Sequence, residues 1–342
     1  MRRGMVHAVL ALALAAACCC AGTATAEEVT KSFEGVTKVE LSSVSGDCVV
    51  KTHRSGEVIV ELYYEVEPEG AFEYEMKESG KKLVIKEKWG KSGRRHYTSG
   101  EVSWTLTVPA DTEIEFTTAS GDITASGLTK GMHARTASGD IDLAEMRGDI
   151  EISTASGDAI LVNLEGDVEI STASGDIEID GAKGDIELST ASGDIEAEGV
   201  DGDIDFSTAS GDLEIARSSG TFDVSCASGD LQAEGITIMG ESEFSAASGD
   251  VSVTLAKTAD YDLEISTASG DVTLDYDGNE VKGFFEFTAH ERRGKIVCPF
   301  DFDKEEEFER SGETYLRKSF SRKGDTPRIE LSTASGKAVL KK

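Results

Sequence analysis

The sequence predicts an all-β protein whose centre is a single-stranded β-solenoid, in which successive coils of the chain stack on one another. Three observations predict it. Glycine recurs every nine residues from Gly139 to Gly229, a Thr-Ala-Ser-Gly-Asp unit recurs every 18, and apolar residues alternate with polar ones between the glycines. An alternation with period two is typical of half-buried strands and excludes helical repeats. A nine-residue unit of strand and turn buries little alone, so the units must stack to build a core.

The N-terminal segment 1–26 is typical of a secretory signal. Two arginines and an apolar run precede Ala24-Thr25-Ala26, a small-x-small cleavage pattern. The run is too short to cross a bilayer as a mature helix, and no later stretch is apolar enough to do so. As an alternative, Ala15-Ala16-Ala17-Cys18 loosely resembles a lipoprotein signal, in which Cys18 would carry a lipid anchor. We therefore expect an exported chain that is periplasmic, secreted or held at the cell surface.

Residues 27–117 and 276–342 are expected to form irregular β-rich caps. In the first segment, three stretches read as strands: Val58 to Val66, Lys82 to Lys88 and Val102 to Val108. In the second, a polar stretch from Asp303 to Arg310 comes before a renewed strand pattern at Arg328 to Leu331. Because a stacked sheet leaves unpaired backbone at both ends, a solenoid needs such caps.

Residues 118–275 are predicted to form the solenoid itself, with two strands in each 18-residue coil. The residue two positions after each repeat glycine is apolar. In nearly every case it is followed by Glu or Asp, whose side chain is expected to point outward. These apolar residues are Ile141, Ile150, Ala159, Val168, Ile177, Ile186, Ile195, Ile204, Leu213, Phe222 and Leu231. Each coil adds one strand spacing, about 4.8 Å, so equivalent residues should stack. Strand chirality favours a right-handed coil.

The negative charge of the chain is concentrated in these repeats. The whole sequence has a formal net charge of −31, and residues 118–275 contain 34 acidic but only 6 basic side chains. Such a surface is a poor match for nucleic acid, because phosphate contacts need clustered Lys and Arg. It is an equally poor match for anionic lipid. We therefore expect neither partner.

The stacked acidic residues motivate a calcium hypothesis. One column would contain Asp140, Asp158, Asp176, Asp194 and Asp212. Like charges on adjacent strands repel, and bound divalent cations would relieve that repulsion. The repeats-in-toxin proteins bind calcium with a similar period, but their Gly-Gly-x-Gly-x-Asp turn differs from the turn of this chain. The alternative is that Gly-Asp is a turn pair, in which Gly adopts a positive φ and Asp bonds locally to the backbone. No other cofactor is expected.

The two edges of the predicted solenoid differ. One edge repeats the near-constant Thr-Ala-Ser-Gly-Asp turn, whereas the turns of the other edge vary. A uniform edge has two interpretations. Its stacked hydroxyls can form a structural ladder, or they can present an array for a ligand such as a sugar polymer, calcium or ice. The sequence alone leaves both open.

The sequence shows no catalytic pattern, and we expect no enzyme. The histidines after the signal are His53, His96, His133 and His290, and no metal-binding or nucleophile motif links them. Arg94-Arg95-His96 is interpreted as a solvated turn rather than an anion site. Three cysteines remain after Ala26, namely Cys48, Cys226 and Cys298, and an odd number cannot all pair within one chain. We expect small buried thiols rather than a disulfide scaffold.

Several of these features together resemble the bacterial putative adhesin family, a domain-of-unknown-function family of β-helical repeat proteins of the cell envelope. They are Gly46-Asp47, Leu106-Thr107-Val108-Pro109, the stretch Thr118 to Ile123 and the Ser-Gly-Asp-Ile repeats. The resemblance implies an exported or membrane-associated repeat protein linked to adhesion or to envelope-stress sensing, and it implies no catalytic residues. Our leading hypothesis is a non-catalytic exported scaffold or adhesin-like protein that binds a cell-surface, glycan or protein ligand. The alternatives are a calcium-dependent solenoid and an accessory in envelope-stress sensing.

Overall fold

The computed structural model describes residues 26–90 and 99–342, and the regular structure within them is all β-strand. Residues 1–25 of the predicted signal, including Cys18, and the Arg94-Arg95-His96 turn lie outside the described residues. For the described chain the all-β prediction is confirmed. No helix in this part of the chain is long and apolar enough to cross a membrane. The chain divides into two compact units, one ending at Gly139 and one running from Asp140 to Lys342.

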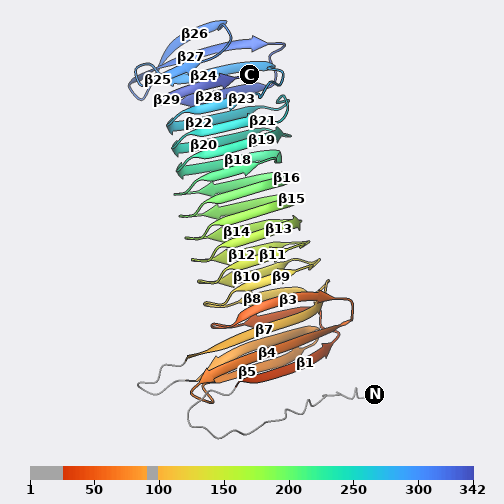
Figure 1. Ribbon diagram of the computed structural model, residues 1–342. Helices are drawn as coiled ribbons and strands as arrows, with labels where there is room; N and C mark the ends of the chain where they lie inside the picture. Colours follow the sequence, from red (N-terminus) through yellow and green to blue (C-terminus); the bar gives the residue numbers. More distant parts are fainter. Residues whose placement is uncertain (1–25, 91–98) are drawn as a thin grey trace. The chain divides into compact units, whose positions relative to one another are not determined.

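The first unit contains two sheets that change from antiparallel to parallel pairing (Figure 1). Its strands are β1 (Glu27–Glu34), β2 (Lys38–Ser42), β3 (Asp47–His53), β4 (Glu57–Glu67), β5 (Phe72–Ser79), β6 (Lys82–Trp89), β7 (Ser99–Pro109), β8 (Glu113–Thr117), β9 (Ile123–Ser126) and β10 (Met132–Thr136). One sheet has the order β1-β4-β7-β3-β9. The other has the order β5-β6-β2-β8-β10.

Coiled pairing begins in the first unit at β2 and β3, well before the first Thr-Ala-Ser-Gly-Asp unit. Val39 of β2 pairs in parallel with Ile114 of β8, and Cys48 of β3 pairs in the same way with Ile123 of β9. The residues between them form β4 to β7, which leave the stack and return to it. The regular spacing of the repeat is therefore interrupted by an insertion, although the parallel stacking of the coils continues across it.

Glu87, in β6, closes the turn of this first coil. Its Oε1 accepts a hydrogen bond from the Ser43 hydroxyl at 2.8 Å, and its Oε2 accepts one from the Val44 N–H at 2.8 Å. Both tryptophan indoles donate to the same carboxylate, Trp104 at 2.7 Å and Trp89 at 3.1 Å. Glu87 is only 9% exposed, and a buried charge of this kind needs such a set of donors.

In the interior turns, the groups equivalent to the Ser43 hydroxyl and the Val44 N–H have different acceptors. In the second unit, the Thr190 hydroxyl donates to the Gly175 carbonyl and the Ala191 N–H donates to the Thr172 carbonyl, both at 3.3 Å. Thr190 and Ala191 hold the positions that Ser43 and Val44 hold in the first coil. The first coil has no preceding turn to supply these two backbone carbonyls, and the Glu87 carboxylate takes their place as acceptor.

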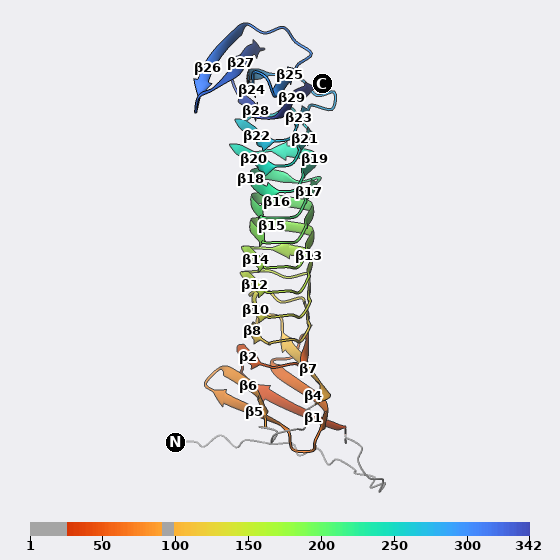
Figure 2. The same ribbon diagram turned by 90° about the vertical axis from the view of Figure 1, so that its left-hand side faces the viewer.

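The second unit consists of stacked coils, drawn from yellow-green to blue in Figure 2. Its strands are β11 (Ile141–Ala144), β12 (Ile150–Thr154), β13 (Ala159–Glu165), β14 (Val168–Thr172), β15 (Ile177–Thr190), β16 (Ile195–Thr208), β17 (Leu213–Ala216), β18 (Ser219–Ser228), β19 (Leu231–Ile238), β20 (Ser242–Ser248), β21 (Val251–Leu255), β22 (Leu263–Ser269), β23 (Val272–Asp275), β24 (Gly283–His290), β25 (Gly294–Val297), β26 (Lys304–Arg310), β27 (Glu313–Arg322), β28 (Arg328–Thr333) and β29 (Gly336–Lys341).

The register of the coils follows the repeat. Along β15 and β16, Ile177 pairs with Ile195 and Thr190 pairs with Thr208, always one repeat period apart and in parallel. The eleven apolar residues two positions after the repeat glycines are each at most 2% exposed, so they form the core as predicted. Phe222 and Phe244 stack at 5.5 Å between ring centroids, at the point where the interval between coils lengthens.

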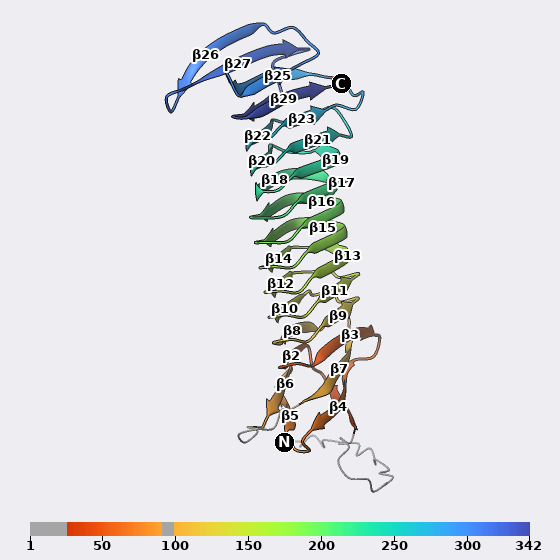
Figure 3. The same ribbon diagram turned by 60° about the vertical axis from the view of Figure 1, so that its left-hand side comes forward.

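A second excursion precedes the last coil. β22 pairs with β28, which follows much later in the chain, and β23 pairs with β29. The chain between them forms β24, which pairs in parallel with β28, and then the antiparallel hairpin of β26 and β27 (Figure 3). The polar stretch from Asp303 to Arg310 therefore contains the first strand of this hairpin, β26.

The described cysteines are free thiols. Cys48 and Cys226 are buried as predicted, whereas Cys298 is only half-buried. Burial raises the pKa of each of the three thiols, so they are poor nucleophiles.

Candidate functional site

The five aspartates predicted as metal ligands lie in one column of the second unit, where they form a hydrogen-bonded ladder. Each backbone N–H donates to Oδ1 of the aspartate one coil earlier, at 2.7 to 3.1 Å. The donors are Asp158, Asp176, Asp194, Asp212, Asp230, Asp250 and Asp271. The same bond occurs in the first unit, where the Asp122 N–H donates to Asp47 Oδ1 at 3.0 Å. Each of these bonds uses one oxygen of the accepting carboxylate. The stacked acidic column thus connects successive turns, in addition to the strand pairing.

Lys337 ends this ladder. It holds the aspartate position of the coil formed by β28 and β29, and its N–H donates to Asp271 Oδ1 at 2.8 Å, as an aspartate would. Its ammonium lies 2.7 Å from Asp271 Oδ2 and lowers the pKa of that carboxyl. The next coil, formed by β24 and β25, places Lys295 opposite Lys337 in parallel register, so the aspartate column ends at Asp271 although the stack of coils continues.

Calcium binding to the ladder stays a prediction. Within residues 26–90 and 99–342, no group of three or more His, Cys, Asp or Glu side chains is arranged to hold a metal ion. Calcium needs six to eight oxygen ligands. Backbone carbonyls, hydroxyls and water would have to supply most of them.

The interpretation of Gly-Asp as a local turn pair is confirmed for the φ of some repeat glycines, such as Gly148 and Gly166, but not for the interior constant turns or for the bond of the aspartate. The φ of Gly175 and Gly193 lies outside the left-handed region. Glycine is required because turns stack closely: a Cβ on Gly193 would lie 2.0 Å from the Gly175 carbonyl oxygen. The aspartate bonds to the next coil rather than to its own turn. A positive φ does occur on the variable edge, for example at Gly184, and in later constant turns such as that of Gly249.

The threonine column is structural. Thr172 is 7% exposed and its Oγ1 accepts a hydrogen bond from the Gly175 N–H at 3.0 Å. In other coils the threonine hydroxyl donates to a carbonyl of the preceding turn, as Thr208 does to Gly193 and Thr267 does to Gly249. These hydroxyls are used within the protein, so this column is not the exposed array considered from the sequence.

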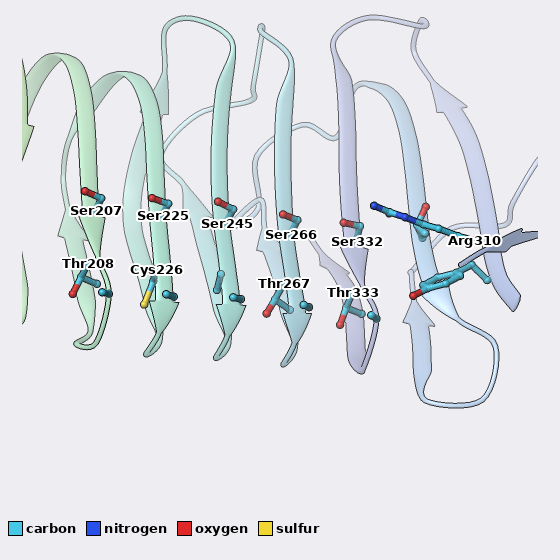
Figure 4. A pocket seen from close by; sticks show the side chains of 18 of the residues that line it. Ser207, Thr208, Ser225, Cys226, Ser245, Ser266, Thr267, Arg310, Ser332 and Thr333 are labelled. Atoms are coloured by element: carbon cyan, nitrogen blue, oxygen red, sulfur yellow. The ribbon is translucent and has the colours of Figure 1, made fainter. Parts of the chain in front are cut away.

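A neighbouring serine column is available to a ligand. Its members precede the column threonines, or the residues in their place, on the outward side of successive strands. The column runs through Ser153, Ser171 and Ser189 in earlier coils, and its members that line a groove are Ser207, Ser225, Ser245, Ser266 and Ser332. All five are half-buried. No hydrogen bond of the described chain uses their hydroxyls. Figure 4 shows them in one straight row across the strands.

This row forms the floor of a groove of about 880 Å³ in the second unit, here called the serine groove. Alanines that follow the threonine column complete the floor, and they are Ala209, Ala227, Ala247, Ala268 and Ala334. Thr288 of β24 and Arg310 and Tyr315 of the hairpin line one end. The groove is therefore smooth and uncharged along its floor, with a cation at one end.

Arg310 is the charged side chain of the groove. Figure 4 shows it reaching from the hairpin toward Ser332. Other hairpin cations have partners: Lys318 contacts Glu305 at 2.9 Å, and Arg317 contacts Glu306 at 3.3 Å. No ion pair of the described residues involves Arg310. Its guanidinium can therefore accept an anionic partner from outside the chain.

An acidic column runs beside the groove. Its residues lie two positions before each groove serine, on the same outward face, and they are Asp205, Asp223, Glu243, Glu264 and Glu330. Burial and, next, the charge of Asp223 raise the pKa of Asp205. Burial and then the charges of Glu243 and Glu330 raise the pKa of Glu264. These carboxylates already repel one another, so a further row of negative charge would be unfavourable.

The described histidines, His53, His133 and His290, do not line the groove. His53 hydrogen-bonds within its own turn, to the Glu57 carbonyl at 2.7 Å. His290 is 7% exposed, and its Nδ1 accepts hydrogen bonds from the N–H groups of Arg292 and Arg293. Both histidines thus have local structural partners.

Sequence reasoning missed Arg310 and Tyr315 as groove residues. The stretch Asp303 to Arg310 is dominated by charged side chains and carries no core-facing alternation. Nothing in the sequence indicates that the hairpin tip returns to strands that lie far before it in the chain.

The chain matches one family model and resembles several solved structures. Residues 36–295 match the family model described as Toastrack DUF4097. None of the curated proteins matches this chain. Similar solved structures include a putative cell adhesion protein from Clostridium sporogenes, with 9% identity, coverage of 93% of this chain and 99% of that chain, and a TM-score of 0.21.

Two further structures are a putative adhesin from Bacteroides fragilis, with 12% identity, coverage of 92% and 97% and a TM-score of 0.29, and a putative adhesin from Parabacteroides distasonis, with 10% identity, coverage of 92% and 98% and a TM-score of 0.39. The resemblance to the bacterial putative adhesin family is confirmed. Since the family model covers most of the sequence, the chain belongs to the Toastrack DUF4097 family.

Proposed function

We propose that this chain is a non-catalytic, exported repeat protein that acts at the cell envelope as an adhesin-like binding protein. The serine groove is its ligand site. The observation that carries the proposal is the row of five hydroxyls without hydrogen-bond partners in the described chain, aligned in one groove. Most other polar turn groups nearby, such as the Asp and Thr columns, are engaged within the protein.

The geometry favours an extended, hydroxyl-bearing ligand such as a glycan. Coils repeat at about 4.8 Å, so the five serines form a linear row. Each hydroxyl can both donate and accept, as a sugar hydroxyl can. An acyl chain would instead leave the serines desolvated without partners, at about 1–3 kcal/mol each. A peptide that adds to a sheet needs a strand edge, whereas the groove presents a sheet face.

A groove-filling substitution tests the proposal. Ser245→Phe should place an aromatic ring in the middle of the groove and weaken binding of labelled neutral oligosaccharides at least tenfold. Ser171→Phe is the matched control, because Ser171 holds the same position on β14 outside the groove. Thermal unfolding of both variants checks the fold. If the two variants lose affinity equally, or if neither does, the groove is not the binding site.

A calcium-dependent solenoid is the alternative function. The observation in its favour is the aspartate ladder, which uses only one oxygen of each carboxylate. Calcium that binds the folded state would raise the unfolding midpoint, since a ligand of the folded state alone stabilises it. The test compares thermal unfolding in excess EDTA with unfolding in millimolar calcium at equal ionic strength. An unchanged midpoint removes this alternative. A role as an accessory in envelope-stress sensing rests on the family resemblance.

The proposal also includes a right-handed coil with two strands per 18-residue coil, and export directed by the N-terminal segment. The parallel register supports the coil. Mass spectrometry of the mature N-terminus distinguishes cleavage after Ala26 from a chain that begins at Cys18. Incorporation of labelled palmitate is expected in the second case and is absent in the first.

A further inference from the structure

We propose that the serine groove selects an oligosaccharide whose body is uncharged and whose terminal sugar carries one carboxylate, with that carboxylate bound by Arg310. This inference rests on the proposed function of the groove, and it adds the charge pattern and the orientation of the ligand.

The first argument is the unequal distribution of charge along the groove. Its floor contains Ser, Thr, Ala and Cys226, none of which carries a charge when Cys226 is buried and protonated. Arg310 lies at the hairpin end and has no carboxylate partner among the described residues. A guanidinium presents paired N–H donors that match the two oxygens of a carboxylate. A single acidic group therefore fits at this end.

The second argument excludes a polyanion. The acidic column lies two residues before the serines on each strand, about 6.6 Å away along the strand. Burial and then the neighbouring carboxylates Glu243 and Glu330 of this column raise the pKa of Glu264. A ligand with a carboxylate on every sugar would place a second row of negative charge beside it. The same argument disfavours heavily sulfated chains and nucleic acids.

The third argument concerns the direction in which the oligosaccharide lies along the groove. Arg310 and Tyr315 close one end of the groove, whereas the floor continues to Thr190 at the other end. A bound chain would direct its acidic terminus toward β28 and the hairpin, and its neutral body toward β16. Extension of the chain is free only in the second direction, so a terminal acid should bind better than an internal one.

The test uses the full mature chain and three probes with the same neutral body of five glucose units: unmodified, with one terminal uronic acid, and with a terminal sulfate. A polyuronate of equal length is the fourth probe. Binding is measured by isothermal titration calorimetry. The uronate-terminated probe should bind about tenfold more tightly than the unmodified one, equivalent to about 1.4 kcal/mol, and the polyuronate should bind most weakly. A sulfate that binds as well as the uronate would replace the carboxylate specificity with a general preference for one terminal anion.

Arg310→Gln should abolish the preference for the acidic terminus, so that the unmodified and the uronate-terminated probes bind this variant with equal affinity. Arg322→Gln is the matched control, because Arg322 belongs to the same hairpin but lies over the Phe300 ring outside the groove. Equal binding of the neutral and acidic probes, or a preference that survives Arg310→Gln, overturns the inference and leaves the proposed function standing. If no probe binds at millimolar concentration, both are overturned.

Discussion

Glu87→Ala should destabilise the first unit by about 3–5 kcal/mol, the cost of leaving several buried donors without an acceptor. The substitution removes the acceptor of four hydrogen bonds, from Ser43, Val44, Trp89 and Trp104. Trp104 is fully buried, so its indole N–H would lose its partner without access to water, at about 1–3 kcal/mol. The two donors of the first turn lose the acceptors that a preceding coil would supply, at about 1 kcal/mol each.

Glu87→Gln separates the hydrogen bonds from the volume of the side chain. The amide keeps one acceptor oxygen but presents an NH₂ group to donors on its other side. We expect it to cost about half as much as the alanine. Glu73→Ala is the control, because Glu73 is exposed on β5 of the same unit. It should change stability by less than about 0.5 kcal/mol.

Urea unfolding followed by tryptophan fluorescence is a suitable assay. The chain has two tryptophans, Trp89 and Trp104, and both donate to Glu87. The folded-state emission should therefore change in the alanine variant, and the unfolding midpoint should fall. If Glu87→Ala matches Glu73→Ala in midpoint and leaves the emission unchanged, Glu87 does not terminate the coil stack.

Four further predictions concern the repeats of the second unit. Asp176→Ala removes the acceptor of the Asp194 N–H and should lower the free energy of unfolding, measured in urea, by about 1 kcal/mol. Asp176→Asn keeps the acceptor and relieves repulsion between neighbouring carboxylates, so this variant should be at least as stable as the wild type. Gly193→Ala would place a Cβ 2.0 Å from a carbonyl oxygen and should lower the melting temperature far more than Ser192→Ala in the same exposed turn; similar melting temperatures would contradict the close stacking of turns. The raised pKa of Glu264 contributes stability that is present at low pH and lost as pH rises through that pKa, so Glu264→Gln should raise the melting temperature at pH 7 and have little effect at pH 3. The lowered pKa of Asp271 has the opposite sign: its contribution is present at neutral pH and lost as pH falls, so Lys337→Met should be destabilising at pH 7 only.

The hydrogen bonds of the repeats explain why one turn is nearly constant while the opposite turn varies. The constant turn requires Gly for close stacking, Thr for the corner and Asp for the ladder, and each of these residues contacts the equivalent turn of a neighbouring coil. A substitution in one coil therefore disturbs two coils. Cys226 replaces a threonine and still donates to the Gly211 carbonyl, so this position requires a small side chain with a hydrogen-bond donor.

The repeat itself determined the fold of the solenoid. A period of 18 with inward apolar residues admits one stacking register, because a shift by one residue would expose the whole apolar column. The burial of Ile177 and its equivalents could therefore be predicted without coordinates, as could the column of aspartates. The bonding within that column could not, since turn geometry decides whether an Asp side chain bonds to its own turn or to the next one.

Only the tertiary structure decided the parts that depend on contacts between residues far apart in the chain and outside the period. β24 and β25 stack in the coil register on β28 and β29, whereas the excursion from β4 to β7 and the hairpin of β26 and β27 have no counterpart in the repeat. The sequence therefore did not reveal that Glu87 completes the turn at Ser43. For the same reason it did not place Arg310 at the end of the serine groove. A periodic pattern specifies the contacts between each coil and the next. The ends of the stack and the hairpin each occur once, so their contacts depend on the path of the irregular segments and not on the repeat.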